Sequence, residues 1–353
     1  MSTDEKPQFE TFVDNLLSWY AHAARELPWR VGPVARARGC RPDPYRVWLA
    51  EIMLQQTTIA HATPYYQSFI RRWPAIVDLA AAQDADIMAA WAGLGYYARA
   101  RNLHTCARLV AANAGVWPQD YKGLKALPGI GPYTAGAIAA LAFDLPHAAV
   151  DANVERVFSR LLRLTGNWAG QKRTIHQAVQ ALVPHGRPAE FAEALMDLGA
   201  MICTPKSPQC SICPVAETCL ARKVGDAQAY PAKPPKSKKP RRLGHVYVLV
   251  HTSQAVVTQL RPARGLLGGM LGLPTSDWQQ DVRPPPIFPD EARWQDCGEI
   301  RHVFTHFELT LQVWGAHSDR QISDATPISS ALDALPTVFR KALKKALKSL
   351  ETK

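Results

Sequence analysis

The sequence has no long hydrophobic run. Nowhere do its 353 residues approach the ~20 consecutive apolar residues that a membrane-spanning helix requires. Its first ten residues, MSTDEKPQFE, are polar and acidic with no apolar stretch behind them, unlike a secretion signal. An internal repeat is also missing, which argues against a solenoid. We therefore expect a protein of the cytoplasm that makes no use of a membrane.

Cysteine is sparse and unevenly placed. There are seven cysteines, and Cys40, Cys106 and Cys297 are scattered, whereas the other four fall within 203–219. A disulfide framework spreads its cysteines through a small secreted domain. The crowding here instead indicates a metal site in a reducing compartment.

Acidic residues are outnumbered. The sequence has 30 acidic against 41 basic residues, a net charge of +11, and residues 223–243 alone hold seven basic and one acidic residue. That segment contains YPAKPPKSKKPRR, which has no aliphatic side chain larger than alanine and is typical of an extended tether. We expect a basic linker and a polyanionic partner.

The pattern of apolar residues differs on the two sides of this linker. Before it, apolar residues recur at helical spacing, as in Phe12, Leu16 and Trp19. After it come short β-rich runs, HVYVLV, AVVTQL and HVFTHFELTLQVW, and one basic helix around VFRKALKKALKSL. The pattern predicts a multidomain chain with an all-α domain over 1–222 and a smaller α+β domain over 244–353.

The cysteine-rich segment has the spacing C-x6-C-x2-C-x5-C, formed by Cys203, Cys210, Cys213 and Cys219. Four thiolates on so short a loop suit tetrahedral zinc or a [4Fe–4S] cluster. Zinc modules usually join two short cysteine pairs, and only one C-x-x-C occurs here, so the spacing favours iron–sulfur. A purely structural cluster is the alternative to a functional one. Lys206 lies inside the loop, within reach of a phosphate.

A glycine-rich turn occupies residues 127–138, LPGIGPYTAGAI. Gly129 and Gly131 permit a tight turn, and Pro132 suits the first position of a helix, so backbone N–H groups and the helix dipole would face an anion. We expect that anion to be a DNA phosphate. A simple connection between two packed helices is the alternative.

Two carboxyl groups are candidates for chemistry. On a helix over VWLAEIMLQQT, Glu51 shares a face with Trp48 and Gln55, and apolar surroundings favour the protonated form that a general acid needs. Asp151, in HAAVDANVERVF, precedes the next helix. Taken alone, Asp151 or Asn153 suits a helix N-cap, and Glu51 suits one charge on an amphipathic helix.

In this order, the four segments resemble the helix–hairpin–helix superfamily of DNA glycosylases, and most closely its adenine-specific MutY-type branch. Four further motifs are similar to that branch: LPWR (27–30), DPYRVWLAEIMLQQTT (43–58), GLGYYARARNLH (93–104) and RPARGLLGGMLGLP (261–274). The resemblance covers most of the chain and both domains. It implies base excision from duplex DNA that carries A:8-oxoguanine or A:G mispairs, by a monomer associated with the nucleoid.

The resemblance also implies roles for single residues. Glu51 matches the general acid that protonates adenine at N7 and later activates water. Asp151 matches the carboxylate that stabilises positive charge on the deoxyribose. Tyr133 and Asn153 match polar residues around the leaving base and its sugar.

Other positions match DNA contacts and ligands. Gln55 and Tyr96, or Tyr97 in its place, match residues that wedge into the base stack when adenine is flipped out. Bifunctional members carry a Schiff-base lysine where this chain has Tyr133, so we expect a monofunctional enzyme. The four cysteines of 203–219 match the ligands of a [4Fe–4S] cluster.

The second domain resembles a MutT/Nudix-like fold that reads 8-oxoguanine. Nudix hydrolysis needs a Glu-rich helix after the segment GLLGGMLGLP, and the residues that follow supply none, so we expect binding without hydrolysis. The matching recognition residues are Phe304, Thr305 and His306, with threonine where serine is more usual. The stretch 31–42 is longer than the family usual, and we expect a solvated loop there.

Three other functions compete with this interpretation. An endonuclease III-like enzyme would share the fold and cluster but cleave the strand, and Tyr133 argues against it. A non-catalytic DNA-binding module would have no use for Glu51 and Asp151 together. Hydrolysis of oxidised nucleotides by the second domain would require the missing Glu-rich helix.

Overall fold

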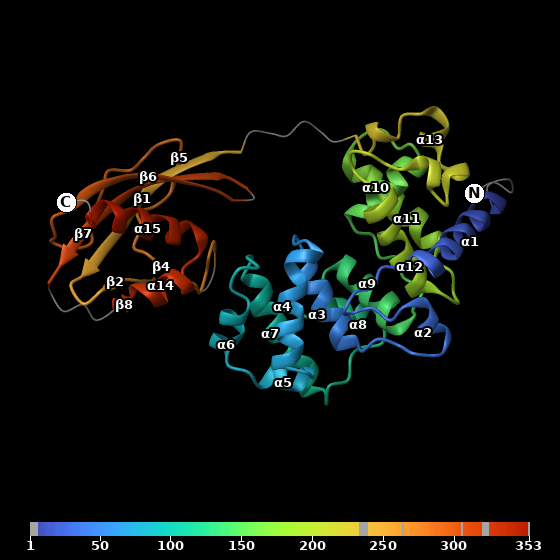
Figure 1. Cartoon of the computed structure of the whole chain (residues 1–353), viewed down its shortest axis with the longest axis horizontal. Helices are drawn as coiled ribbons and strands as arrows, with labels where there is room; N and C mark the ends of the chain where they lie inside the picture. The colour runs from blue at the N-terminus through green and yellow to red at the C-terminus, as the bar shows by residue number, and fades with distance from the viewer. Residues whose placement is uncertain (1–5, 233–238, 263–264, 305, 320–324, 352–353) are drawn as a thin grey trace. The chain divides into compact units, whose positions relative to one another are not determined.

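The chain divides into two compact units, Met1–Pro235 and Lys236–Lys353, which Figure 1 draws in one view. The structure is a computed structural model that describes residues 6–232, 239–262, 265–304, 306–319 and 325–351. Over those ranges, no helix combines the length and the apolar character needed to span a bilayer.

The first unit is built from helices, with no strand among its described residues. The α-helices are α1 (Lys6–Ala23), α2 (Pro33–Ala37), α3 (Pro44–Leu54), α4 (Ile59–Arg72), α5 (Ile76–Ala81), α6 (Asp84–Ala90), α7 (Ala98–Ala112), α8 (Tyr121–Ala126), α9 (Pro132–Phe143), α10 (Ala152–Leu161), α11 (Trp168–Leu182), α12 (Pro188–Asp197) and α13 (Leu220–Val224). Shorter elements are the π-helix η1 (Leu198–Ile202) and the 3-10 turns η2 (Cys210–Ile212), η3 (Ala216–Thr218) and η4 (Ala227–Ala229). The prediction of an all-α first domain is confirmed.

Helix α9 is the central element of this unit. Every residue from Thr134 to Ala142 is buried, and the helix packs against α3, α8 and α12. Small side chains let its neighbours approach closely: a Cβ atom on Gly136 would lie 2.5 Å from the carbonyl oxygen of Ala148. A helix that is apolar on all sides must lie inside the fold, so its N-terminal turn is held rigidly.

Local sequence signals set the first residues of α3, α9 and α10, the helices that carry Glu51, Tyr133 and Asn153. Asp43 caps α3 by accepting a hydrogen bond from the backbone N–H of Tyr45, and Pro44 is its first residue. Gly131 precedes α9, whose first residue is Pro132. Asp151 caps α10. These are the residue types that favour helix N-termini.

The linker predicted over 223–243 spans fewer residues in the structure. Its first part contains the end of α13 and all of η4, and the ring of Tyr230, which follows η4, is buried in the first unit. The Tyr230 carbonyl accepts a 3.1 Å hydrogen bond from Nε of Arg160. At the other end, strand β1 already begins at Arg241. The composition of the segment obscured these contacts because alanine and one aromatic ring are enough to pack its first part.

The second unit is a mixed sheet with helices, which confirms the predicted α+β class; the sequence indicated one helix, and the described residues form two. Its elements are β1 (Arg241–His251), β2 (Ala255–Val257), β3 (Gln259–Leu260), β4 (Leu271–Gly272), β5 (Gln279–Gln280), β6 (Gln295–Val303), β7 (Glu308–Ser318), β8 (Ala325–Pro327), α14 (Ile328–Ala334) and α15 (Thr337–Glu351). The main sheet has the order β6-β7-β1-β2-β8, and β5 also pairs with β1. Strands β1 and β7 are parallel, while β6 and β7 form an antiparallel hairpin.

The two faces of this sheet are covered differently. Val246 and Val248 of β1 pack into a core that includes the apolar side of α15. His245 and Tyr247 alternate with them and so point to the other face, where the Tyr247 hydroxyl accepts a 2.9 Å hydrogen bond from the N–H of Ile287. Between β4 and β6 the described chain contains strand β5 and no helix.

The close packing of α9 gives a test of the fold. We expect Gly136→Ala to destabilise the protein by about 1–3 kcal/mol, because the new methyl group meets a backbone carbonyl that cannot move away easily. The clash outweighs the ~1 kcal/mol that alanine gains over glycine in a helix. Thermal unfolding followed by circular dichroism measures the change. Gly186→Ala is the control, because a Cβ atom there meets nothing within 4 Å; a G136A protein as stable as the parent would contradict the packing.

Candidate active site and cysteine-rich loop

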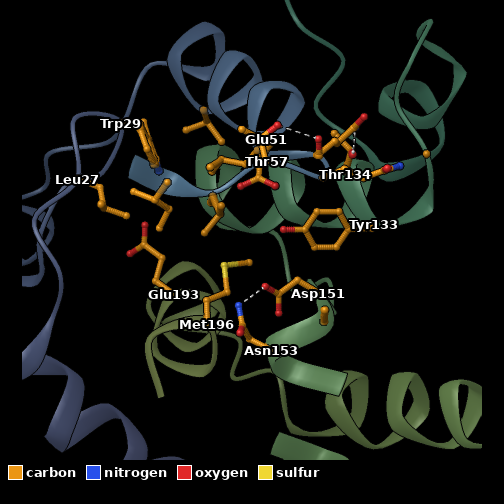
Figure 2. Close-up of a pocket in the computed structure, with 18 of the residues that line it drawn as sticks. Leu27, Trp29, Glu51, Thr57, Tyr133, Thr134, Asp151, Asn153, Glu193 and Met196 are labelled. Carbon is orange, nitrogen blue, oxygen red and sulfur yellow. Dashed lines mark hydrogen bonds between the residues drawn. The ribbon is translucent and has the colours of Figure 1, made fainter. Parts of the chain in front are cut away.

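A cavity of about 870 Å³ opens between the helices of the first unit. Its volume is within the range of small-molecule sites. Helices α3, α9, α10 and α12 line it together with Arg25, Leu27, Trp29 and Arg30, and Figure 2 shows ten of the lining residues by name. Of the predicted site residues, the cavity brings together Glu51, Gln55, Gly129, Gly131, Tyr133, Asp151 and Asn153.

Glu51 lies on α3 and is only 6 % exposed. Burial, followed by the nearby charge of Asp151, raises the pKa of its carboxyl to about 7, although a hydrogen bond with Tyr133 acts in the opposite direction. In Figure 2 the carboxyl group points into the cavity. It can therefore hold a proton near neutral pH and release it there, as a general acid requires.

Tyr133 occupies the first turn of α9, immediately after the glycine-rich turn. Burial and the two carboxyl groups of Glu51 and Asp151 raise the pKa of its phenol well above the ordinary value. The hydroxyl group therefore stays protonated and acts as a hydrogen-bond donor. Figure 2 shows the ring beside Glu51, with the hydroxyl directed into the cavity.

Asp151 lies across the cavity from Glu51 and is both a helix cap and part of the site. Its Oδ1 accepts a hydrogen bond from the N–H of Val154 and its Oδ2 one from Nδ2 of Asn153, each of 2.8 Å. Burial raises the pKa of Asp151, while these hydrogen bonds and the charge of Arg156 favour its anion. Of the two carboxyl groups, Asp151 has the better support for a negative charge.

Arg156 joins this side of the cavity to the cysteine-rich loop. Its Nη2 donates to Oδ1 of Asn153 at 2.9 Å and to the carbonyl of Gly199 at 2.7 Å, and its Nε donates to the carbonyl of Cys203 at 2.8 Å. A Cβ atom on Gly199 would approach that of Asn153 to 2.6 Å. The orientation of Asn153 therefore depends on the position of the loop.

Sequence reasoning missed a buried ion network on the opposite wall. Glu193 of α12 is 2 % exposed, lines the cavity, and accepts a 2.7 Å hydrogen bond from the hydroxyl of Tyr20. Arg30 lies 3.8 Å from Glu193 and pairs with Asp197 at 2.8 Å, and Arg25 pairs with Asp197 at 2.6 Å. The available signal was two acids spaced i,i+4 in the otherwise apolar segment FAEALMDLGA, which places both on one inward face.

The two predicted wedge residues lie near one arginine. Arg99 donates a hydrogen bond to the carbonyl of Gln55, and its guanidinium lies 5.4 Å from the ring centre of Tyr96. Gln55 also donates to Oγ1 of Thr134 at 3.3 Å. The Tyr96 side chain is 47 % exposed, on a backbone with φ of +48°. Tyr96 is not among the residues that line the cavity, whereas Gln55 is.

The two glycines of the turn between α8 and α9 differ in the space beside their Cα atoms. Gly129 has a φ of +77°, and a Cβ atom there would lie 3.0 Å from that of Asn102, so glycine is required. At Gly131 a Cβ atom would meet nothing within 4 Å. The backbone at Gly131, just before the N-terminus of α9, is therefore exposed and not covered by a neighbouring side chain.

The four cysteines of 203–219 surround one small pocket, into which Arg160 and Arg222 also project. Burial raises the pKa of Cys213 to about 12, and the nearby thiols of Cys203, Cys219 and Cys210 add to this. Over the described residues, no group of His, Cys, Asp and Glu side chains converges closely enough for a single metal ion. Four thiols around one pocket suit a metal centre, and two arginines suit the negative charge of an iron–sulfur cluster.

The remaining predicted residues are not among those that line the cavity. Lys206 is exposed on the cysteine-rich loop of the first unit. Phe304 and His306 belong to the second unit, in the turn between β6 and β7, where the N–H of Phe304 donates to the carbonyl of Phe307 at 2.9 Å and His306 is exposed. Thr305 is outside the described residues.

Models of known families match both units. Residues 49–185 match the HhH-GPD superfamily of base excision DNA repair proteins, and residues 203–219 match the iron–sulfur binding domain of endonuclease III. Residues 245–345 match the NUDIX domain. The cysteine-rich loop is thus an iron–sulfur loop, and the predicted [4Fe–4S] cofactor is confirmed.

Individual proteins are similar over most of the chain. The adenine DNA glycosylase of Mus musculus is 33 % identical over 90 % of this chain and 72 % of its own length. That of Mycolicibacterium smegmatis is 39 % identical over 60 % of this chain and 69 % of its own. The structure of a thermostable thymine-DNA glycosylase superposes with a TM-score of 0.54 and 29 % identity, over 62 % of this chain and 99 % of the other.

The buried carboxyl of Glu51 gives a test that needs no substrate. An unfolded chain releases this proton near pH 4.5, whereas the folded protein retains it up to about pH 7. Stability is therefore lost as pH rises between these values, and the loss is complete above the higher one. We expect Glu51→Gln, which cannot ionise, to stabilise the protein by up to ~3 kcal/mol more at about pH 8 than at about pH 5.

Chemical denaturation at the two pH values measures this difference. Glu26→Gln is the matched control, because Glu26 is exposed and its charge has little effect on folding. If E51Q and E26Q change stability equally at both pH values, Glu51 does not have the raised pKa described here.

Proposed function

Since the chain belongs to the adenine DNA glycosylase family, within the HhH-GPD superfamily of base excision DNA repair proteins, we infer that it is a DNA N-glycosylase that hydrolyses the bond between adenine and deoxyribose. We propose that its substrate is duplex DNA in which adenine is mispaired with 8-oxoguanine or guanine. The observation that carries the mechanism is the convergence of Glu51, Tyr133 and Asp151 on one cavity.

Glu51 is the proposed general acid. Its carboxyl proton passes to N7 of the flipped adenine, so the C1′–N9 bond breaks and the base leaves as a neutral molecule. Water then adds to C1′ and returns a proton to Glu51. A carboxyl group whose pKa is about 7 suits both halves of this cycle. Tyr133, which is hydrogen-bonded to Glu51, orients the acid.

Asp151 is proposed to stabilise the oxocarbenium character that develops on the sugar as the base departs. Hydrogen bonds from Val154 and Asn153 hold its oxygens in place before the reaction. A positive charge within the cavity would lower the pKa of Asp151 and so oppose the effect of burial, which means that the transition state itself favours the anion. Glu51 and Asp151 then act in opposite protonation states across the nucleoside.

Glu193 and Arg30 are proposed to read the edge of the base. A carboxylate oxygen accepts a hydrogen bond from an exocyclic amino group such as that at C6 of adenine, and a guanidinium donates to a ring nitrogen. Both side chains line the cavity opposite Asp151. A base without the amino group would leave Oε1 of the buried Glu193 without a hydrogen-bond donor, which costs binding energy.

We propose that the enzyme is monofunctional. A bifunctional glycosylase needs an amine that attacks C1′ to form an imine, and the phenol of Tyr133 cannot do so. The product is then an abasic site in an intact strand. This also separates the chain from an endonuclease III-like activity, in spite of the shared iron–sulfur loop.

DNA contacts are assigned to the edges of the helical unit. The backbone at Gly129 and Gly131 would bind a phosphate, and Gln55 and Tyr96 would fill the gap left by the flipped base. Cys203, Cys210, Cys213 and Cys219 would hold the [4Fe–4S] cluster, which would make their loop rigid. The exposed Lys206 would add a phosphate contact.

The second unit is proposed to bind the 8-oxoguanine base and to hydrolyse nothing. The turn that holds Phe304, Thr305 and His306 is the proposed contact. Nudix chemistry needs a helix of acidic metal ligands, and the described residues between β4 and β6 form no helix. We assign excision to the helical unit, lesion recognition to the second unit and connection to the residues between Tyr230 and Arg241, in a monomer that acts on nucleoid DNA.

Excision under single-turnover conditions tests the chemistry. We expect adenine to be released from duplexes with 8-oxoguanine or guanine opposite and to be retained opposite thymine. Glu51→Gln should slow excision by about 10² to 10⁴, the usual contribution of a general acid. Asp151→Asn should slow it by about 10² or more, because a neutral amide cannot stabilise the charged sugar. Glu26→Gln should leave the rate unchanged, and an E51Q protein as fast as the parent would remove Glu51 from this role.

Borohydride trapping tests the absence of lyase chemistry. An enzyme that forms an imine with DNA becomes covalently attached when borohydride reduces it. We expect the parent protein to yield free abasic product and almost no covalent complex in a denaturing gel. Efficient trapping would show that a lysine elsewhere attacks the sugar and would contradict the monofunctional assignment.

A further inference from the structure

The stretch 31–42 is not the solvated loop that its composition suggests. It contains helix α2, and of its three arginines one, Arg36, is buried with 5 % exposure, while Arg38 and Arg41 are exposed. A guanidinium that is nearly removed from water requires several partners. The contacts of Arg36 therefore show what the additional residues of this segment do.

Arg36 is anchored to the end of α9. Its Nη2 donates a 3.0 Å hydrogen bond to the carbonyl of Leu141, in the last turn of that helix, and its Nε donates to the carbonyl of Val31 at 3.2 Å. Carbonyl groups in the last turn of a helix have no partner within the helix. Asp144, which ends α9, lies 3.6 Å from Nη1 of Arg36. These contacts fix the guanidinium behind the cavity wall.

From this position Arg36 faces Glu193. Its Nη2 lies 3.8 Å from Oε1 of Glu193, the oxygen that Arg30 also approaches to 3.8 Å. Oε2 is occupied by the hydroxyl of Tyr20. Oε1 is therefore within ion-pair range of two cations but beyond hydrogen-bond distance of either, and its lone pairs remain available.

The way the arginines are shared makes Arg36 the important partner. Arg30 and Arg25 already pair with Asp197 at 2.8 and 2.6 Å. Without Arg36, Glu193 would keep only Arg30 within ion-pair range, and that arginine is already paired with Asp197; a buried carboxylate with so little compensation takes up a proton more readily. Burial raises the pKa of Glu193, and Arg30 and Arg36 are the two charges that oppose this most.

We propose that Arg36 is a positioning residue for base recognition: its guanidinium keeps Glu193 ionised and its Oε1 free to accept a hydrogen bond from the 6-amino group of adenine. The segment 31–42 thereby contributes to substrate selection through Glu193, and its own side chains do not touch the base. This inference rests on the function proposed above.

The test compares two substrates, adenine and unsubstituted purine, which lacks the 6-amino group, each placed opposite 8-oxoguanine. Arg36→Met removes the charge and keeps the apolar stem. We expect it to slow single-turnover excision of adenine by about tenfold or more while excision of purine falls much less. Arg36→Lys, which keeps the charge, should recover most of the loss on adenine.

Two further variants separate positioning from a structural role. Asp144→Asn removes the other acidic neighbour of Arg36 and should leave the ratio of the two rates at the parent value. In a Glu193→Gln background, Arg36→Met should no longer change that ratio. Equal losses on both substrates, or a change of ratio that persists with Gln at 193, would overturn the proposal.

A stability measurement is independent of activity. The difference in unfolding free energy between the parent and R36M should widen from about pH 5 to about pH 8, because Arg36 stabilises only the ionised Glu193, and this widening should disappear in the E193Q background. Other titratable or charged groups near this cluster are the same in all variants: Tyr20, Arg25, Arg30, Arg41, Glu51, Asp144 and Asp197. If the parent released no adenine, the proposed function would fail; if the widening persisted in E193Q, the Arg36 to Glu193 coupling would fail.

Discussion

A carboxyl group that leaves water must be protonated or surrounded by compensating charges and donors, and the helical unit depends on this constraint. Around one cavity it is met in three ways. Glu51 keeps its proton because its surroundings are apolar. Asp151 receives hydrogen bonds at the start of α10. Glu193 is matched by guanidinium groups from segments far away in the sequence. The chemical difference between the three acids follows from their surroundings.

The central helix α9 makes this arrangement possible. Because it is buried on all sides, its first turn and its last turn are both fixed. The first turn holds Tyr133 beside Glu51, and the last turn holds the Leu141 carbonyl that anchors Arg36. One element thus positions the acid at one end of the cavity and supports the opposite wall at its other end. The iron–sulfur loop contributes in a similar way, since Arg156 connects Cys203 to Asn153.

Much of this could be predicted from the sequence where the cause is local. Pro132 after Gly131, Asp151 before a helix and four cysteines within 203–219 are short-range signals whose geometry depends on neighbouring residues. The family resemblance added roles for Glu51 and the cysteines. The all-α and α+β classes of the two domains could be predicted because apolar residues recur at helical spacing in the first and in short β-rich runs in the second. The ends of the linker could not be predicted in this way, because the amino-acid composition of the segment does not show that Tyr230 packs against neighbouring alanines.

The sequence alone therefore determined the two-domain architecture, which rests on periodicity along the chain, and the cofactor and the family, which rest on motifs that resemble a known family. Only the tertiary structure decided which charges are buried and what they face. Tyr20 and Glu193 are 173 residues apart and hydrogen-bonded, and Arg36 reaches a carbonyl 105 residues away. An arginine in a basic segment is expected to be exposed to solvent, and only the fold shows that Arg36 is buried. Desolvation is a property of the packed chain, and it is what sets the pKa of each group in the cavity.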